Sequence, residues 1–267
     1  MVSLDRSFGR EAFGDDPANY HSARPAYPQE TWAALRERAG LRPGIEILEI
    51  GAGTGLATLP LLAAHPAHLT AVEPDPRLAD FLRATAANAR LDVVAASFED
   101  ADLPPASFDL AVSATAFHWL DARSALPRLH TLLRQDGALA LVWNIFGDDS
   151  RPDPFHEATT HLFAGHRTSY SGGGTGGPIY GMDMEQRLRE MTEAGFHPDP
   201  PQFVRWTLSL DAVGVRNLYA TYSNVTALAA TERTELLDAL ARIAAQQFGG
   251  RIDRNMTTAI YTARRVS

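Results

Sequence analysis

The first 144 residues alternate short apolar runs with longer stretches whose apolar positions recur at helical spacing. The apolar runs predict buried strands over 45–50, 68–74, 92–97, 107–114 and 138–144. The amphipathic stretches predict helices over 28–39, 56–65, 76–90 and 122–137, with Pro76 in a first turn and Gly137 as a stop. Strands that alternate with helices indicate parallel βαβ units, so we expect an α/β fold with a doubly wound, Rossmann-like sheet and helices on both faces.

The pattern changes after Asn144. Residues 145–180 contain a glycine cluster at 171–178, and glycine loses much backbone freedom when it is ordered. Beyond it we expect helices over 182–194, 211–222 and 231–248, and strands over 203–210 and 255–265. Two late strands after five parallel ones suggest an antiparallel edge on the same sheet. We therefore predict one domain over 1–267, with an N-terminal segment 1–44, a core 45–144, and an insertion with closing strands over 145–267.

Composition excludes several classes of protein. The formal net charge is −8, and no basic run stands out, which argues against a nucleic acid or an anionic membrane as partner. Cysteine is absent, which excludes disulfides, thiolate nucleophiles and cysteine-ligated metals. All 24 basic residues are arginine, so Schiff-base lysine chemistry and a Walker-type loop are excluded. No apolar stretch resembles a signal core or a membrane span, so we expect a cytoplasmic protein.

The segment EILEIGAGTGLATL carries the strongest chemical signal. Gly51, Gly53 and Gly55 follow a predicted strand and open a predicted helix, where a backbone approaches a ligand closely. Such turns also serve dinucleotides, so the glycines by themselves indicate only a nucleotide-like cofactor. The spacing here is G-x-G-x-G, however, and differs from the dinucleotide pattern G-x-G-x-x-G.

Glu49 discriminates between the possible cofactors. A carboxylate beside a pyrophosphate is repelled by about 1 kcal/mol or more at a few Å. S-adenosylmethionine (SAM) instead carries an ammonium and a sulfonium, which a carboxylate attracts. Glu73 ends the second predicted strand and offers two acceptor oxygens for ribose hydroxyls, and Asp75 follows near the ribose and adenine edge. We therefore favour SAM, with S-adenosylhomocysteine (SAH) as the product.

The motifs EIGAGTG, VEPD, SFED, FDLAVSATAFHW and YTARR resemble the class I SAM-dependent methyltransferases. Within them the chain is similar to the small-molecule branch that includes trans-aconitate methyltransferases. The resemblance implies the strand order 3-2-1-4-5-7-6 with strand 7 antiparallel, and an N-terminal segment that closes over the cofactor. It implies cofactor contacts from Glu49, Gly51, Ala52, Gly53, Gly55, Glu73, Pro74, Asp75, Ser97, Phe98, Glu99, Thr115, Tyr20 and Arg24. Arg24 could instead be a structural arginine in a loop.

His118 follows the fourth predicted strand, beside the first, where an open α/β sheet places its ligands. We expect it to line the site, as a general base, as a hydrogen-bond partner of a substrate oxygen, or as a residue that fixes the loop. Further predicted substrate contacts are Tyr27, Trp119, Tyr170, Tyr180 and Tyr222. His156, His161 and His166 recur every five residues, which does not suit a helical metal pair, so we expect no metal.

The expected function is methyl transfer from SAM to a small molecule, with oxygen slightly favoured over carbon or nitrogen as the acceptor atom. Two alternatives stay open at this point: an NAD(P)-dependent oxidoreductase on a Rossmann fold, and a SAM-binding protein without catalysis. The substrate and the oligomeric state are not encoded in any motif found here.

Overall fold

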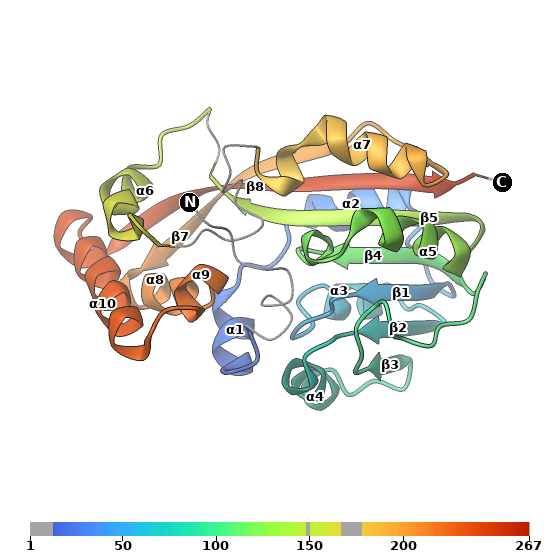
Figure 1. The fold of residues 1–267 in the computed structure, drawn as a ribbon, viewed down its shortest axis with the longest axis horizontal. Coiled ribbons are helices and arrows are strands. Elements are labelled where there is room, and N and C mark those ends of the chain that lie inside the picture. The colour runs from blue at the N-terminus through green and yellow to red at the C-terminus, as the bar shows by residue number, and fades with distance from the viewer. Residues whose placement is uncertain (1–12, 148–149, 167–177, 267) are drawn as a thin grey trace.

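The computed structural model describes residues 13–147, 150–166 and 178–266. Within these ranges eight strands form one sheet, and helices cover both of its faces (Figure 1). The strands are β1 Glu46–Ile50, β2 His68–Val72, β3 Leu91–Val94, β4 Phe108–Ala114, β5 Leu133–Phe146, β6 Phe196–Pro198, β7 Gln202–Asp211 and β8 Arg251–Arg265. The α-helices are α1 Pro17–Ala23, α2 Gln29–Arg38, α3 Thr58–Ala63, α4 Pro76–Thr85, α5 Ala122–Leu132, α6 Pro154–Thr159, α7 Met184–Glu193, α8 Ala212–Tyr219, α9 Ser223–Thr226 and α10 Ala230–Gln247, and the 3-10 turns are η2 Phe117–Trp119, η3 Thr160–Phe163 and η5 Tyr180–Met182.

The sheet order confirms the predicted fold class. The strands run β3-β2-β1-β4-β5-β8-β6, with β7 also paired to β8. The first five are parallel, and β8 is antiparallel to β5, from Ala138↔Arg264 to Phe146↔Met256. Both β6 and β7 pair with β8, so the edge strand of the predicted order is present as two segments.

Two layers of helices bury the two faces of the sheet. On one face α2, α3 and α4 pack on side chains such as Ile47 and Leu110, and on the other α5 and α7 pack on side chains such as Leu139 and Tyr261. Both faces of the central strands are therefore apolar, as expected for a parallel sheet covered on two sides. This burial fixes the carboxyl ends of β1 and β4 side by side.

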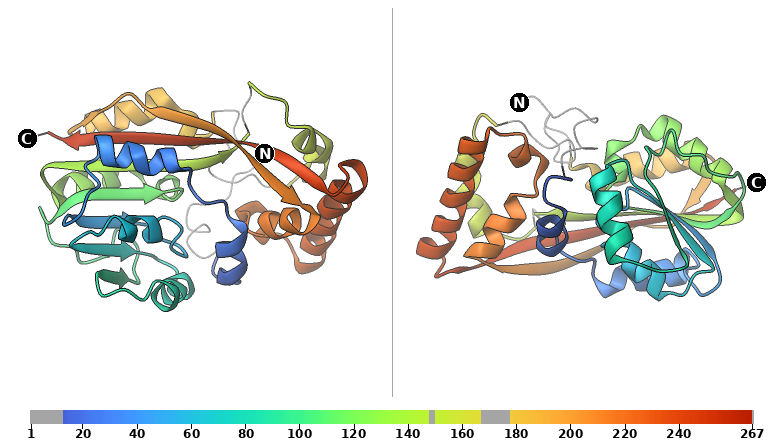
Figure 2. Two further views of the ribbon diagram at one scale, coloured as in Figure 1. Left: turned by 180° about the vertical axis from the view of Figure 1, so that it is seen from behind. Right: turned by 90° about the horizontal axis from the view of Figure 1, so that it is seen from below.

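A third cluster of apolar residues forms a separate cap. Helices α6, α8 and α10 enclose it, with Phe155, Val215 and Leu240 among its buried members. The cap lies beside the last residues of β7 and the first residues of β8 (Figures 1 and 2). Helix α1 lies between the cap and the sheet core, in contact with α8 and α4. The predicted division of the chain into one domain with three parts stays a prediction.

Some predicted boundaries differ from the structure. The helix expected over 122–137 ends at Leu132, because Leu133 pairs with Phe108 and begins β5, so Gly137 is not its stop. Helix α1 has no counterpart among the predicted elements. Among the described residues, no helix combines the length and the apolar character that a membrane crossing requires.

Candidate active site

The turn after β1 adopts backbone conformations that require glycine. Gly51 has φ +69°, and a Cβ there would lie 2.4 Å from Cβ of Ala116. Gly53 has φ +57°, and a Cβ there would meet no atom within 4 Å. Gly51 therefore allows β1 to approach the loop after β4, whereas Gly53 faces open space at the edge of a cavity.

Glu73 organises the turn through its carboxylate. The backbone N–H of Gly53 donates to Oε2 over 2.7 Å, and that of Asp75 donates to Oε1 over 3.0 Å. Burial raises the pKa of Glu73 to about 7, although these two hydrogen bonds lower it. Each carboxylate oxygen has a further lone pair, so Glu73 can still accept hydrogen bonds from a ligand.

Glu49 is a second buried carboxyl group in the same place. Its Oε2 accepts a hydrogen bond of 2.7 Å from the Thr58 hydroxyl, and its side chain is 1% exposed. Burial raises the pKa of Glu49 to about 8, the Thr58 hydrogen bond lowers it, and the nearby Glu73 raises it further. Two buried carboxyl groups at one end of the sheet favour a cationic ligand, because a cation relieves the cost of ionising them.

A first cavity brings most of the predicted cofactor residues together. It opens at the carboxyl ends of the parallel strands, where open α/β sheets bind their ligands. The predicted residues that line it are Glu49, Gly51, Ala52, Gly53, Glu73, Pro74, Ser97, Phe98, Glu99, Thr115, Tyr20 and Arg24, together with Tyr27 and Trp119, which were predicted to contact substrate.

Two predicted cofactor residues lie outside this lining. Asp75 is 1% exposed and caps α4 by accepting from the backbone N–H of Arg77, and it also pairs with the Arg77 guanidinium at 2.7 Å. Gly55 packs against α4, where a Cβ would lie 2.6 Å from Cδ1 of Leu82. In this structure Asp75 holds the start of α4 and Gly55 allows close helix packing, and their predicted contacts with the cofactor stay predictions.

The N-terminal segment covers the cavity. Arg24 ends α1, and its Nη2 donates to the carbonyl of Thr221 over 2.7 Å. The Arg24 guanidinium lies 5.2 Å from the ring centroids of both Tyr20 and Tyr222, and its buried Nε has no hydrogen-bond partner among the described residues. Tyr27 hydrogen-bonds to Oγ1 of Thr115 over 2.8 Å. The segment thus connects the cap, the cofactor turn and the loop after β4.

A second cavity of about 390 Å³ adjoins the first. Among the described residues, seven line both cavities, namely Phe13, Tyr20, Arg24, Thr115, Trp119, Asn144 and Phe146. The second cavity is lined further by His118, Trp143, Ile145, Gly147, His156, Thr160, Phe163, Ile179, Gly181, Tyr219, Tyr222, Ser223, Asn224 and Arg254. Its walls come from β5, η2, the cap and the start of β8.

His118 lines the second cavity, but its hydrogen bonding does not suit a general base. The indole N–H of Trp143, which can only donate, donates to Nδ1 of His118 over 3.2 Å. Nδ1 therefore accepts, and the neutral ring carries its proton on Nε2. His118 in this state is a hydrogen-bond donor at Nε2, so the structure argues against the base role among the three predicted for it.

The remaining predicted substrate residues divide into three groups. Tyr222 lines the second cavity. Tyr180 is outside the lining of both cavities, because its ring packs against Trp143 at 5.7 Å and under the Arg187 guanidinium at 3.6 Å. Tyr170 and most of the glycine cluster lie outside the described residues. Within the described residues, no cluster of side chains could hold a metal ion.

Several lining residues were missed by sequence reasoning. Asn144 and Phe146 end β5, and their place at the carboxyl end of a strand was a usable signal. Asn144 donates to the carbonyl of Pro25 over 3.1 Å and accepts from Thr258 over 2.7 Å, so it joins three distant segments. Arg254 had no signal, because nothing in the closing strand marks it as a cavity residue.

Residues 48–141 match the family described as "Methyltransferase domain". An uncharacterized methyltransferase of Schizosaccharomyces pombe is 27% identical over 259 residues, which cover 95% of this chain and 97% of that protein. Residues 48–141 therefore form a methyltransferase domain, and these matches support a class I SAM-dependent methyltransferase. A methyltransferase-like protein of the same yeast is 35% identical over 142 residues, and this match spans only 54% of its length and 53% of the chain.

Solved structures show the same fold as this methyltransferase. A type II methyltransferase candidate from Anaeromyxobacter dehalogenans superposes with a TM-score of 0.64 at 24% identity, covering 90% of this chain and 97% of that one. The [4+2]-cyclase SpnF superposes with a TM-score of 0.58 at 15% identity, covering 99% and 98%. Since a protein named as a cyclase shares the fold, the fold alone does not determine the reaction.

The first cavity has the chemistry that SAM, the cofactor of this family, requires. Glu49 and Glu73 are buried carboxyl groups whose pKa values are raised to about 8 and about 7, so a bound cation would favour their ionised forms. Gly53 leaves open space beside Glu73. The residues of this cavity therefore fit SAM, and the placing of Glu49 near its cationic end and of Glu73 at its ribose stays a prediction.

Proposed function

We propose that the chain transfers a methyl group from SAM to an oxygen atom of a small molecule bound in the second cavity. One observation carries this proposal: the second cavity shares a wall with the cavity that holds Glu49 and Glu73. Ligands bound in the two cavities would approach each other beside Thr115, Trp119 and Asn144, which line both cavities. SAM, when bound, supplies an electrophilic methyl group on a sulfonium, and the chain's own contribution is alignment.

The described lining of the second cavity offers no carboxylate base, which supports an oxygen that arrives ionised. Among the described residues that line the second cavity there is no Asp or Glu. His118 already accepts a hydrogen bond at Nδ1, and burial raises the pKa of the Tyr222 hydroxyl well above its usual range. A carboxylate or an acidic phenol loses its proton in water and needs no base in the site. Carbon acids and alcohols need one, so they fit less well.

The aromatic surroundings support the same assignment. Methyl transfer from a sulfonium to an anionic oxygen removes both charges, and a dry cavity favours a step in which charge disappears. Trp119, Trp143 and Phe146 are among the side chains that would keep water away from the two reacting groups. The role of the protein is then to exclude water and to align the oxygen with the methyl group.

The test is incubation with isotopically labelled SAM and a panel of small carboxylic acids, phenols, alcohols and amines, followed by mass spectrometry. We expect label in methyl esters or methyl ethers. Label only in amines or at carbon would contradict oxygen as the acceptor atom. SAM binding without transfer to any member would favour a non-catalytic SAM-binding protein, and binding of NADH without SAM would favour an oxidoreductase.

A further inference from the structure

We propose that the second cavity recognises an apolar acid, and that Arg254 together with Tyr222 holds its anionic oxygen group. This inference depends on the proposed function only in that it names the acceptor of the same site. It concerns binding, and it can therefore be tested without any methyl transfer.

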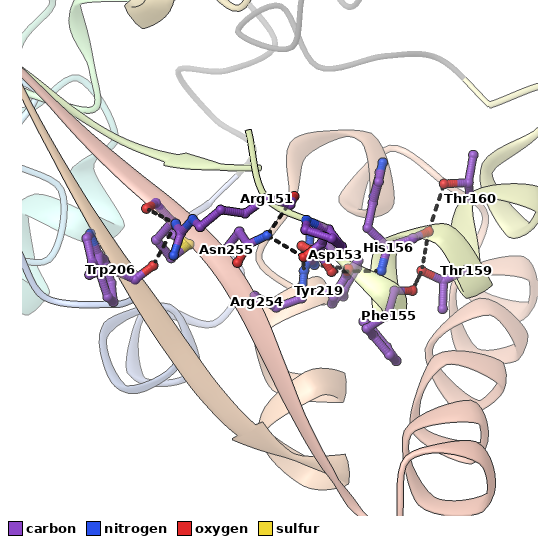
Figure 3. Close-up of polar contacts among 12 residues, drawn as sticks. Arg151, Asp153, Phe155, His156, Thr159, Thr160, Trp206, Tyr219, Arg254 and Asn255 are labelled. Atoms are coloured by element: carbon purple, nitrogen blue, oxygen red, sulfur yellow. Dashed lines mark hydrogen bonds and ion pairs between the residues drawn. The ribbon is translucent and has the colours of Figure 1, made fainter. Parts of the chain in front are cut away.

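Arg254 is a buried cation that faces the cavity with unused donors. Its side chain is 3% exposed, and it lines the second cavity from the start of β8. Its Nε donates to Oδ2 of Asp153 over 2.8 Å, and its Nη1 donates to the hydroxyl of Tyr219 (Figure 3). A guanidinium has five N–H donors. Among the described residues, the other three have no acceptor, so Arg254 can take a carboxylate.

The counter-ion of Arg254 lies behind it. Oδ1 of Asp153 accepts from the backbone N–H of His156 over 2.9 Å and so caps α6, while Oδ2 accepts from Arg254. Asp153 does not line the cavity, and its side chain is buried between α6 and β8. Asp153 thus holds the guanidinium in place, and the remaining N–H groups of Arg254 are left for an acceptor in the cavity that it lines. This arrangement is a prepared site for an acceptor group.

Tyr222 supplies a second polar group that lacks a partner. Its hydroxyl oxygen is buried and makes no hydrogen bond to the described residues. Its ring lies 4.8 Å from the ring of Tyr219, which Arg254 contacts, and 5.2 Å from the guanidinium carbon of Arg24. A buried hydroxyl without a partner is costly, and a ligand oxygen beside it would remove that cost.

The charge of the lining selects against a cationic acceptor. The cations Arg24 and Arg254 line the cavity, and among the described residues no carboxylate does. Aromatic rings can attract cations, but several of the lining rings already lie near guanidinium groups of the protein. Arg24 lies over Tyr20 and Tyr222, and Arg254 lies near Phe146, Phe155 and Tyr219. A further cation would be repelled by both arginines.

The rest of the cavity suits an apolar body. Trp143, Ile145, Phe146, Phe163 and Ile179 contribute apolar surface beside the polar end. Pockets of this kind bind mainly through apolar contact and use a few polar groups for orientation. The acceptor is therefore expected to combine an apolar, ring-sized or chain-like body with one anionic oxygen group.

The test compares three matched probes on the full chain saturated with SAH: 3-phenylpropionate, 3-phenylpropanol and 3-phenylpropylamine. Their apolar bodies are the same, and only the end group differs. Calorimetry or a thermal-shift titration should rank the acid first and the amine last. Tyr222→Phe, which removes one hydroxyl, should weaken binding of the acid about tenfold and leave binding of the alcohol nearly unchanged.

Two controls keep the outcome interpretable. Tyr261→Phe makes the same chemical change at a buried tyrosine outside the cavity lining, where the hydroxyl donates to the carbonyl of Gly181, and it should leave the ranking unchanged. SAH affinity should be unchanged in Tyr222→Phe. Equal or tighter binding of the amine, or an equal loss for acid and alcohol in Tyr222→Phe, would overturn the proposal. Loss of SAH binding by the wild-type chain would instead count against the proposed function.

Discussion

The indole N–H of Trp143 donates to Nδ1 of His118, and this one hydrogen bond assigns the proton of the neutral imidazole to Nε2. His118→Asn should therefore lower kcat/KM for the acceptor, by about tenfold, through loss of a donor and of packing. SAM affinity and the shape of the pH–rate profile should stay the same. Steady-state rates between pH 5.5 and 9 provide the measurement.

If one limb of the pH–rate profile disappeared in His118→Asn, the histidine would transfer a proton in the reaction. This result would contradict the assignment of His118 as a hydrogen-bond donor. Trp143→Phe is the matched comparison, because it removes the indole donor and leaves the histidine. It should allow Nδ1 to accept a proton from elsewhere, and so it is the variant in which a new pH dependence is expected.

Glu73→Ala should weaken SAM binding by at least tenfold. The carboxylate accepts from the backbone N–H groups of Gly53 and Asp75, so its loss removes both the ribose acceptor and the support of the turn. Hydrogen bonds to a charged group contribute about 1.5–3 kcal/mol each. Calorimetric titration with SAM measures the loss, and Asp80→Ala, at an exposed surface pair, is the control. Unchanged affinity would remove Glu73 from the cofactor site.

The ligand-free protein should become less stable as the pH rises from about 4.5 to about 8. The folded-state pKa values of Glu73 and Glu49 are raised to about 7 and about 8, above the usual 4.5. In this window the folded state holds protons that the unfolded state has released. Their contribution to stability is complete below the unfolded pKa and is lost as the pH passes through the folded pKa.

Glu49→Gln isolates this effect, because glutamine keeps an acceptor for Thr58 but does not ionise. At pH 9 its free energy of unfolding should exceed that of the wild type by on the order of 1–3 kcal/mol. Below pH 5 the two should be similar. Urea denaturation across the pH range measures the difference, with Glu37→Gln on the exposed side of α2 as the control. Parallel pH curves for Glu49→Gln and the wild type would refute the raised pKa.

Gly53→Ala and Gly55→Ala should separate binding from packing. A Cβ at Gly53 meets no atom, so the fold should lose only about 1 kcal/mol for the positive φ, while SAM affinity falls because the methyl group points into the cofactor space. A Cβ at Gly55 meets Leu82 at 2.6 Å, so stability should fall by about 1–3 kcal/mol more.

Denaturation curves and SAM titrations on both variants provide the two readouts. The folded fraction of Gly55→Ala should keep most of its SAM affinity, since this residue is outside the cavity lining. If the two variants lost affinity and stability in the same proportion, the distinction between the two glycines would fail.

The sheet could be predicted because its signals are local. Apolar runs, helical spacing and the Gly51–Gly53 turn each depend on neighbouring residues, and five parallel strands follow from them. Helix α1 was missed because it has seven residues, none of them buried, and therefore no apolar period to detect. The end of α5 was predicted too late in the chain, because Leu133 pairs with a strand that is distant in sequence, and local spacing does not encode this pairing.

The first cavity was largely predicted, and the second was not. Spacing could not distinguish a carboxylate that caps a helix, such as Asp75, from one that lines the cavity, such as Glu73, because both follow the end of β2. The second cavity joins Phe13, His118, Ile179, Tyr222 and Arg254, which come from segments far apart in the chain. Only tertiary packing brings them together.

Strand β8 has a mechanical consequence. It runs without interruption from Arg251, beside the cap, to Arg265 in the sheet core, and it pairs with β7 over its first ten residues and with β5 over most of the rest. Arg254 therefore lies on the same continuous strand as residues of the sheet core. Strand β8 joins the cap to the core without an intervening loop. Phe13, Tyr20 and Arg24 of the N-terminal segment line both cavities. A movement of this segment would therefore alter the cofactor cavity and the acceptor cavity together.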